Sequence, residues 1–291
     1  MSMPKVLFIG LGMMGRPMAG HIAKAGYPLV VSDTNADAVK ELCAEVGAVS
    51  IQSLESLSDI DVIITMLPNS SIVEAVLLGE QGIAKRVKPG TVVIDMSSSE
   101  PLRTRELAAE LDKLSINLLD APVSGGVKRA VSGTLAIMLG GEGAVVEKYS
   151  ALISTMGKIT HVGPVGAGHA IKALNNYVSA AGLLATVEAL HIGEKFGLDP
   201  AIMTDVLNTA SGANFATENK VKQFMLSGSY ASGFALQLMV KDLKIAVALG
   251  EQMDQPMKLG HECLEVWKEA AEESDARTDH TEMYRIVGHH G

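Results

Sequence analysis

The chain has few cysteines and few aromatic residues. Its two cysteines, Cys43 and Cys263, lie far apart and fit no metal-ligand spacing, so we expect no metal site and two unpaired thiols in a reducing compartment. Aromatic residues make up only 4% of the 291 residues, whereas hydrophobic residues together make up 47%. The core is therefore predicted to consist mainly of aliphatic side chains and methionine.

Long apolar runs and an excess of positive charge are also missing. No run approaches the roughly 18 apolar residues of a membrane helix, and the first one, residues 5–9, is too short for a secretion signal. We therefore expect no membrane segment and a cytoplasmic location. A net charge of -9 disfavours nucleic acid or an anionic membrane as a partner, but a local pair of lysines can still hold a small anionic substrate.

Residues 1–163 alternate short apolar runs with helical segments. The runs are continuous rather than alternating, which indicates strands buried on both faces of a mostly parallel sheet. Strand and helix in repetition predict a doubly wound α/β domain of the Rossmann type. The predicted strands are Val6–Ile9, Leu29–Ser32, Val62–Met66, Val92–Asp95, Leu118–Asp120 and Leu135–Leu139, and the predicted helices include 16–25, 36–46 and 101–113.

Residues 164–291 are predicted to form an all-α domain. After a glycine-rich turn, residues 169–195 contain no proline and are apolar nearly all round, which predicts a long, buried, central helix. Asp199 followed by Pro200 predicts a helix start, and a further helical run reaches Met253. Asp279 and Glu282 have the spacing of a capping box.

A glycine-rich segment follows the first predicted strand and precedes a helix. In such a segment the first glycine permits a tight turn, the second lets the backbone approach a pyrophosphate, and the third lets the helix pack on the strand. The phosphates then bind at the positive end of the helix. The candidate cofactor-binding residues here are Gly10, Leu11, Gly12, Met13, Met14 and Gly15.

Asp33 ends the second predicted strand, 18 residues after Gly15. A carboxylate at this place accepts hydrogen bonds from the adenosine ribose hydroxyls and repels a 2′-phosphate. No arginine follows in Thr34 or Asn35 to bind such a phosphate. The sequence therefore predicts NAD rather than NADP as the cofactor. The alternative is that the glycines form an ordinary turn and that Asp33 caps a helix.

Three further strand ends carry candidate site residues, because ligands of open α/β sheets bind at the carboxyl ends of the strands. Leu67 and Pro68 are predicted to line the cofactor, and Ser97 to bond the nicotinamide ribose or the substrate, unless Ser97 only caps the helix that follows. Ser124 is followed by Gly125 and Gly126, and these residues form a predicted carboxylate-binding turn or, alternatively, a plain glycine turn.

Lys172 and Asn176 lie four residues apart on the long predicted helix and so share one face. Either the lysine reaches solvent or it faces a cleft, and the apolar residues around it favour the cleft. Burial and a neighbouring cation would lower its pKa enough for work as a general base. Lys241, beside Asp242, is a candidate for that cation or, alternatively, a surface charge.

Four blocks in this order resemble the β-hydroxyacid dehydrogenase family, over nearly the whole chain. They are Gly-Leu-Gly-Met-Met-Gly at 10–15, Asp-Ala-Pro-Val-Ser-Gly-Gly at 120–126, Gly-x-x-x-Lys-x-x-x-Asn at 168–176 and Lys-Asp-Leu at 241–243. The resemblance implies a Rossmann domain and a helical domain joined by a long helix. It also implies a homodimer or homotetramer formed through the helical domain.

The resemblance assigns roles at matching positions. Lys172 matches the catalytic lysine and Asn176 the amide that orients the substrate. Residues 124–126 match the loop that binds the substrate carboxylate. Lys241 matches a lysine near nicotinamide and substrate, with Asp242 in support, while Leu67, Pro68 and Ser97 match cofactor contacts. Residues 214–219 fall where substrate-side residues vary among members, and they receive no role.

The function implied is the NAD-dependent oxidation of a small 3-hydroxy acid to its semialdehyde, or the reverse reduction, as for 3-hydroxyisobutyrate. A reductase of tartronate semialdehyde or another short aldehyde acid is the alternative. Imine reductases generally lack a lysine where Lys172 stands, and 6-phosphogluconate dehydrogenases are usually much longer. A non-catalytic nucleotide-binding protein is less favoured, because it would need the glycines but not Lys172, Asn176 and Ser124 together.

Overall fold

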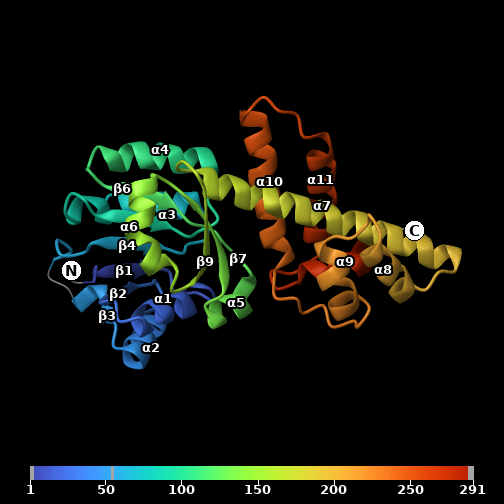
Figure 1. Ribbon diagram of the computed structural model, residues 1–291, viewed down its shortest axis with the longest axis horizontal. Coiled ribbons are helices and arrows are strands. Elements are labelled where there is room, and N and C mark those ends of the chain that lie inside the picture. The colour runs from blue at the N-terminus through green and yellow to red at the C-terminus, as the bar shows by residue number, and fades with distance from the viewer. Residues whose placement is uncertain (1–2, 54–55, 288–291) are drawn as a thin grey trace. The chain divides into compact units, whose positions relative to one another are not determined.

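The computed structural model describes residues 3–53 and 56–287, and it divides into two compact units, Met1–Lys172 and Ala173–Gly291. Figure 1 shows a sheet flanked by helices in the first unit and helices in the second. This confirms the predicted fold class, a Rossmann-type domain followed by an all-α domain.

The first unit is built on a sheet with strand order β3-β2-β1-β4-β5-β6-β8-β7, with β9 paired to β8. The strands from β3 to β6 are parallel, and β8 runs antiparallel to both β6 and β7. The order reverses direction beside β1, where dinucleotides bind in such sheets. The strands are β1 Val6–Ile9, β2 Leu29–Ser32, β3 Val49–Ser50, β4 Val62–Thr65, β5 Val92–Asp95, β6 Asn117–Asp120, β7 Val123–Ser124, β8 Leu135–Gly140 and β9 Gly157–Gly163.

Both faces of this sheet are buried, as the continuous apolar runs predict. Successive residues of β1 alternate between two hydrophobic clusters, with Val6 and Phe8 in one and Leu7 and Ile9 in the other. Helices α3 and α4 cover one face, and α1, α2 and α6 contribute to the other cluster (Figure 1). The helices are α1 Gly15–Lys24, α2 Ala36–Val46, α3 Ser70–Leu78, α4 Pro101–Asp112, α5 Gly126–Ser132 and α6 Gly143–Ile153.

Helix α7, Ala167–Phe196, begins in the first unit and continues into the second. The predicted helix is therefore confirmed, but its burial on all sides is wrong within the single chain. Ile192 and Phe196 are 70% and 84% exposed, whereas Leu183, Val187 and Leu190 enter the core of the second unit. Only one face of the C-terminal part of α7 is buried.

The second unit packs the remaining helices around a core that includes Trp267. Asp199 caps α8 as predicted, because its side chain accepts from the N–H groups of Ala201 and Ile202. Asp279 also caps a helix, but the predicted capping box is wrong, since the Glu282 carboxylate pairs with Arg285 instead. These helices are α8 Pro200–Thr209, α9 Phe215–Asn219, α10 Leu236–Gln252, α11 Lys258–Glu272 and α12 Met283–Ile286, with a π-helical turn Val221–Met225 and a 3₁₀ turn His280–Glu282.

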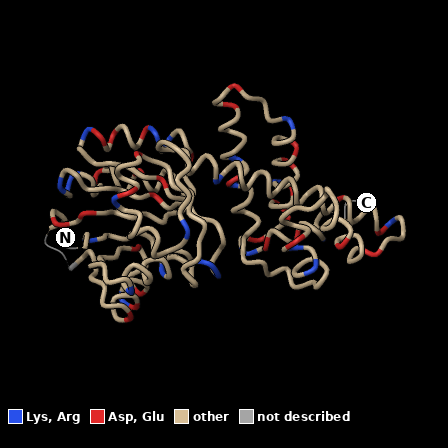
Figure 2. The backbone as a smooth tube through the Cα atoms, in the orientation of Figure 1, with Lys and Arg blue, Asp and Glu red and all other residues tan. Residues whose placement is uncertain are grey.

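Charged residues of both signs are distributed over both units. Figure 2 shows Lys and Arg interspersed with Asp and Glu along the backbone of each unit. Within residues 3–53 and 56–287, no helix combines the length and the apolar character that crossing a bilayer requires.

Candidate active site

The glycine segment has the geometry that its residues predict. Gly10 has φ +100°, and a side chain there would collide with the Met66 carbonyl of the neighbouring strand end. A side chain at Gly15 would collide with the carbonyl of Gly10, so the start of α1 packs directly on the turn. At Gly12, by contrast, a Cβ would meet nothing within 4 Å. The middle glycine therefore leaves open space beside the backbone, which fits the close approach of a pyrophosphate.

The start of α1 and Asp33 complete a cradle that fits a dinucleotide. Met14, the N-cap residue of α1, makes no side-chain cap, so no side chain competes with an anion there. The Asp33 carboxylate accepts from the N–H of Leu11 at 2.5 Å and from the N–H of Asn35 at 2.7 Å. Oδ2 has a further lone pair, and on Oδ1 a ribose hydroxyl can replace the long 3.5 Å bond from the Thr34 hydroxyl, so Asp33 can bond the glycine turn and two ribose hydroxyls together.

Ser97 ties two strand-end loops together. Its hydroxyl accepts from the N–H of Leu67 at 2.9 Å, and the residue is buried. Leu67 is half-buried and Pro68 exposed, at the end of β4. Ser97 therefore holds the Leu67 loop in place, and its direct contact with a cofactor stays a prediction.

Below this loop lies a buried carboxylate that the sequence reasoning missed. Asp95, the last residue of β5, accepts from the hydroxyls of Thr65 at 2.8 Å and Ser99 at 2.7 Å, and from the N–H of Ser97 at 3.1 Å. The position of an aspartate directly after an apolar run was the available signal. Asp95 fixes the shape of the loop that carries Ser97.

The predicted carboxylate-binding turn sits on a short strand. Val123 and Ser124 pair antiparallel with β8, which fixes the turn to the sheet, and Ser124 is half-buried. Gly125 and Gly126 have φ +127° and +65°, so both positions need the freedom of glycine. This geometry accounts for both glycines, while carboxylate binding by the turn stays a prediction.

Lys172 is 8% exposed, so of the two alternatives for this residue the solvated one is wrong. Asn176 and Asp242 are also buried. The Asn176 amide donates to Asp242 at 2.5 Å and accepts from the Asn175 amide at 3.1 Å. Since a carboxylate only accepts, the nitrogen of Asn176 must face Asp242, and its orientation is fixed.

Lys241 lies on α10 beside the carboxylate it was predicted to accompany. Its amine is 3.9 Å from Asp242, and its side chain is 30% exposed. Asp242 therefore interacts with two of the predicted site residues, Lys241 as predicted and also Asn176, within the second unit. The glycine segment, Asp33, Ser97 and Ser124 belong to the first unit, and Lys172 is its last residue.

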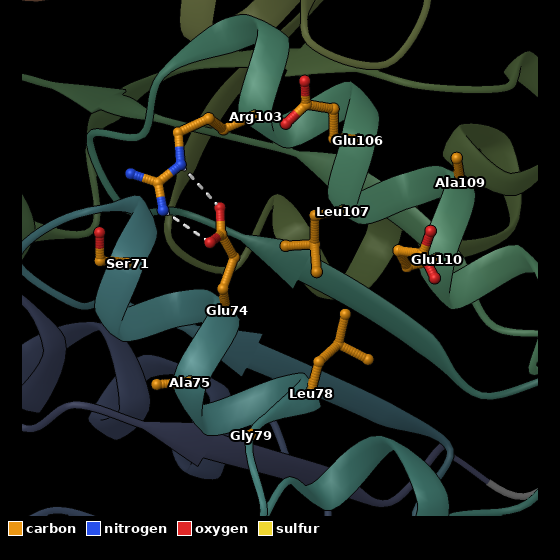
Figure 3. A pocket seen from close by; sticks show the side chains of 10 residues that line it. All are labelled: Ser71, Glu74, Ala75, Leu78, Gly79, Arg103, Glu106, Leu107, Ala109 and Glu110. Carbon is orange, nitrogen blue, oxygen red and sulfur yellow. Dashed lines mark hydrogen bonds and ion pairs between the residues drawn. The ribbon is translucent and has the colours of Figure 1, made fainter.

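A hollow of about 770 Å³ lies between α3 and α4, and none of the predicted site residues lines it. Figure 3 shows Arg103 of α4 at one end of this hollow, where its guanidinium reaches Glu74 of α3 through two hydrogen bonds of 2.9 and 2.6 Å. This pairing raises the pKa of Arg103. We attribute the hollow to the packing of two surface helices fastened by an ion pair, because it contains neither the glycine turn nor a strand end.

Comparison with known proteins gives matches along nearly the whole chain. A family model described as the NAD binding domain of 6-phosphogluconate dehydrogenase matches residues 5–163, and one described as NAD-binding of NADP-dependent 3-hydroxyisobutyrate dehydrogenase matches residues 166–287. A 2-(hydroxymethyl)glutarate dehydrogenase from Eubacterium barkeri is 40% identical over 88% of this chain and 85% of its own length.

Two further relatives are similar over nearly all of this chain. The mitochondrial 3-hydroxyisobutyrate dehydrogenase of Bos taurus is 35% identical over 98% of this chain and 87% of its own. A solved structure of 3-hydroxyisobutyrate dehydrogenase from Mycobacterium tuberculosis with L-serine has a TM-score of 0.91 at 31% identity, covering 98% of this chain and 99% of its own. The similarity therefore includes both the cofactor domain and the helical domain.

Proposed function

Because the chain belongs to the β-hydroxyacid dehydrogenase family and is an NAD-dependent oxidoreductase, we propose that Lys172 is its general acid and base in the interconversion of a small 3-hydroxy acid and its semialdehyde. The observation that carries this proposal is the burial of a lysine one helical turn from an amide whose orientation is fixed. A buried amine is the kind of group whose proton affinity a protein tunes for catalysis.

In this proposal the residues divide the work between binding and proton transfer. Bound NAD supplies the hydride acceptor. Residues 124–126 hold the substrate carboxylate, and Lys172 removes the hydroxyl proton during oxidation or returns it during reduction. Asn176, held by Asp242 and Asn175, keeps the substrate oxygen in register, which supports the positioning on which such reactions depend.

The cofactor contacts are proposed to be shared among several segments of the chain. Residues 10–15 and Asp33 bind the pyrophosphate and the adenosine ribose, which is supported by the open space at Gly12 and the acceptor capacity of Asp33. Leu67 and Pro68 are proposed to line the adenine and ribose side of the cofactor, and Ser97 and Lys241 are proposed to lie on the nicotinamide side. The cofactor domain is taken as residues 1–163 and the helical domain as residues 164–291.

The test of the proton-transfer role is the variant Lys172→Ala. We expect kcat to fall by about 10²–10⁴-fold, the usual worth of a general acid or base, while the protein stays folded. Reduced nicotinamide is followed by absorbance with 3-hydroxyisobutyrate, glycerate, threonate, 4-hydroxybutyrate, L-serine and 2-(hydroxymethyl)glutarate as substrates. Lys195→Ala, an exposed lysine on the same helix, is the matched control. Turnover of Lys172→Ala within a few fold of wild type refutes the role.

A dicarboxylic substrate is a second candidate, favoured by Lys220 in the helical unit. Its amine lies 5.7 Å from the ring centre of Phe215 and 5.3 Å from that of Phe224, and burial lowers the pKa of Lys220. The Asp279 carboxylate opposes this lowering, and we propose that a second substrate carboxylate, such as the one in the substrate named for the Eubacterium barkeri relative, pairs with the same amine. Lys220→Met is then expected to raise KM for 2-(hydroxymethyl)glutarate and not for 3-hydroxyisobutyrate. An equal change for both substrates refutes this candidate.

We also propose that the protein is a cytoplasmic homodimer or homotetramer that associates through its helical domain. Exposed apolar side chains at the end of α7 and on α8, including Phe196, Ile202 and Val206, support association there. Sedimentation of wild type and of Ile202→Glu tests the proposal. The variant is expected to be smaller, and an unchanged sedimentation coefficient contradicts this surface.

A further inference from the structure

His169, in the first turn of α7, lies at the meeting point of three segments that carry candidate site residues. We propose that His169 is a positioning residue for the reaction, which fastens the loop after β5 to the start of α7 and so fixes the place of Lys172. This inference rests on the proposed role of Lys172.

The imidazole is 1% exposed and both of its nitrogens have partners. Nε2 lies 3.1 Å from the carbonyl oxygen of Ser97, and Nδ1 lies 2.8 Å from the hydroxyl of Thr104. A carbonyl oxygen only accepts, so Nε2 carries a hydrogen and donates it to Ser97. The ring therefore bridges the cofactor-side loop and helix α4.

Two buried carboxylates flank the same ring. Asp95 lies 3.7 Å from Nε2 and Asp120 lies 3.8 Å from Nδ1. Asp120 also accepts from the N–H groups of Gly166 at 2.7 Å and His169 at 2.8 Å, which are free donors at the start of a helix. The first turn of α7 is thus bonded to the last residue of β6.

These contacts join the loops on which the proposed chemistry depends. Ser97 holds Leu67 through its hydroxyl and is held by His169 through its carbonyl. Asp120 begins the segment that leads to Ser124. A side chain at Gly168 would collide with the Met138 carbonyl, so α7 also approaches β8 as closely as backbone allows.

Lys172 follows His169 by three residues, so the two lie on neighbouring positions of one helix face. A displacement of the first turn of α7 is passed to Lys172 because a helix moves as a rigid rod over one turn. Since misplacing a reacting group by about 1 Å can cost about 10²-fold in rate, loss of the bond to Ser97 is expected to act on kcat.

The experiment compares His169→Phe, which keeps a ring but loses both nitrogens, with His169→Gln, whose amide can still donate to the Ser97 carbonyl. We expect kcat of His169→Phe to fall at least about 30-fold, with KM for the hydroxy acid within threefold of wild type. His169→Gln is expected to recover most of the loss. His161→Gln is the matched control, because His161 also contacts two backbone carbonyls of the first unit, at 3.0 and 3.1 Å.

A second readout separates positioning from simple destabilisation. With substrate deuterated at the reacting carbon, His169→Phe is expected to show a larger isotope effect on kcat than wild type, because hydride transfer becomes slower relative to product release. A loss of kcat that only follows the folded fraction, with an unchanged isotope effect, overturns the inference. If His169→Phe does not fold, Thr104→Val, which removes the partner of Nδ1, carries the same measurements, and His169→Gln remains the variant expected to stay near wild type.

The outcomes distinguish this inference from the function on which it rests. Wild-type kcat in His169→Phe, together with a strong loss in Lys172→Ala, overturns the positioning role alone. Absence of turnover by the wild-type protein with every hydroxy acid overturns both.

Discussion

Lowering the pH from 7 to 5 is expected to destabilise the helical unit, because His280 is buried and neutral in the folded chain. The residue is 4% exposed, and its Nδ1 donates to the carbonyl of Phe234 at 3.0 Å. Burial lowers the pKa of His280 from 6.5 to about 4, and the charge of Lys220 adds to the effect while Asp279 opposes it. Below the unfolded value of 6.5, the unfolded chain binds a proton that the folded chain excludes.

The size of the effect follows from these two pKa values. Stability is full above about 6.5 and is lost as the pH falls toward 4, since protonation then favours the unfolded state. Between pH 7 and pH 5 the loss amounts to about 2 kcal/mol, and it approaches about 3 kcal/mol at lower pH. Asp279, whose pKa is below its ordinary value of 3.8, does not titrate in this range.

The single tryptophan provides the assay. Trp267 is fully buried in the core of the unit that contains His280, so its fluorescence reports unfolding of that unit. Urea titrations at pH 7, 6 and 5 are compared for wild type, His280→Gln and His261→Gln, the last being an exposed histidine of the same unit. Wild type and His261→Gln are expected to lose about 2 kcal/mol more than His280→Gln. An equal loss in all three proteins refutes the argument.

Three other predictions concern the cofactor cradle and the start of α7. Asp33→Ala is expected to lower the NAD-over-NADP ratio of kcat/KM at least about tenfold, the worth of charged hydrogen bonds, and an unchanged ratio contradicts the ribose assignment. Asp242→Ala removes the acceptor of the Asn176 amide and is expected to lower kcat about tenfold in steady-state assays. A variant as fast as wild type would show that this hydrogen bond is dispensable. Gly168→Ala is expected to lower the free energy of unfolding by about 1–3 kcal/mol, measured by thermal unfolding. Gly143→Ala, where a Cβ meets nothing, is expected to leave the free energy of unfolding unchanged. Equal melting temperatures of the two variants would contradict the close approach of α7 to β8.

The sequence predicts the strands of the parallel sheet well because their burial imposes continuous apolar runs. Val6–Ile9, Leu29–Ser32 and Val92–Asp95 are strands with the predicted bounds, and the strand from Val62 ends one residue early. The strand Gly157–Gly163 was not predicted. It pairs with β8, all seven of its residues are exposed or half-buried, and it therefore lacks an apolar signature.

The candidate site likewise contains residues that the sequence could predict and contacts that it could not. Residues of the four blocks are found from local spacing, because a glycine turn or a lysine one turn from an asparagine is a local pattern. The partners of His169 are not, since Thr104 and Ser97 lie 65 and 72 residues away from it in the sequence. Only the strand order brings the ends of β5 and β6 to the start of α7, so this network requires the structure.

The carboxylate of Asp33 has a structural role as well as a proposed role in binding the ribose, and this limits how the cofactor preference can be changed. It accepts from the backbone of the glycine turn at Leu11 as well as being placed for the ribose. A substitution made to admit a 2′-phosphate therefore also removes an acceptor that shapes the turn. Engineering this chain for NADP is best begun with serine or asparagine at position 33, which keep an oxygen for Leu11 while removing the negative charge, before any arginine is introduced at position 34 or 35.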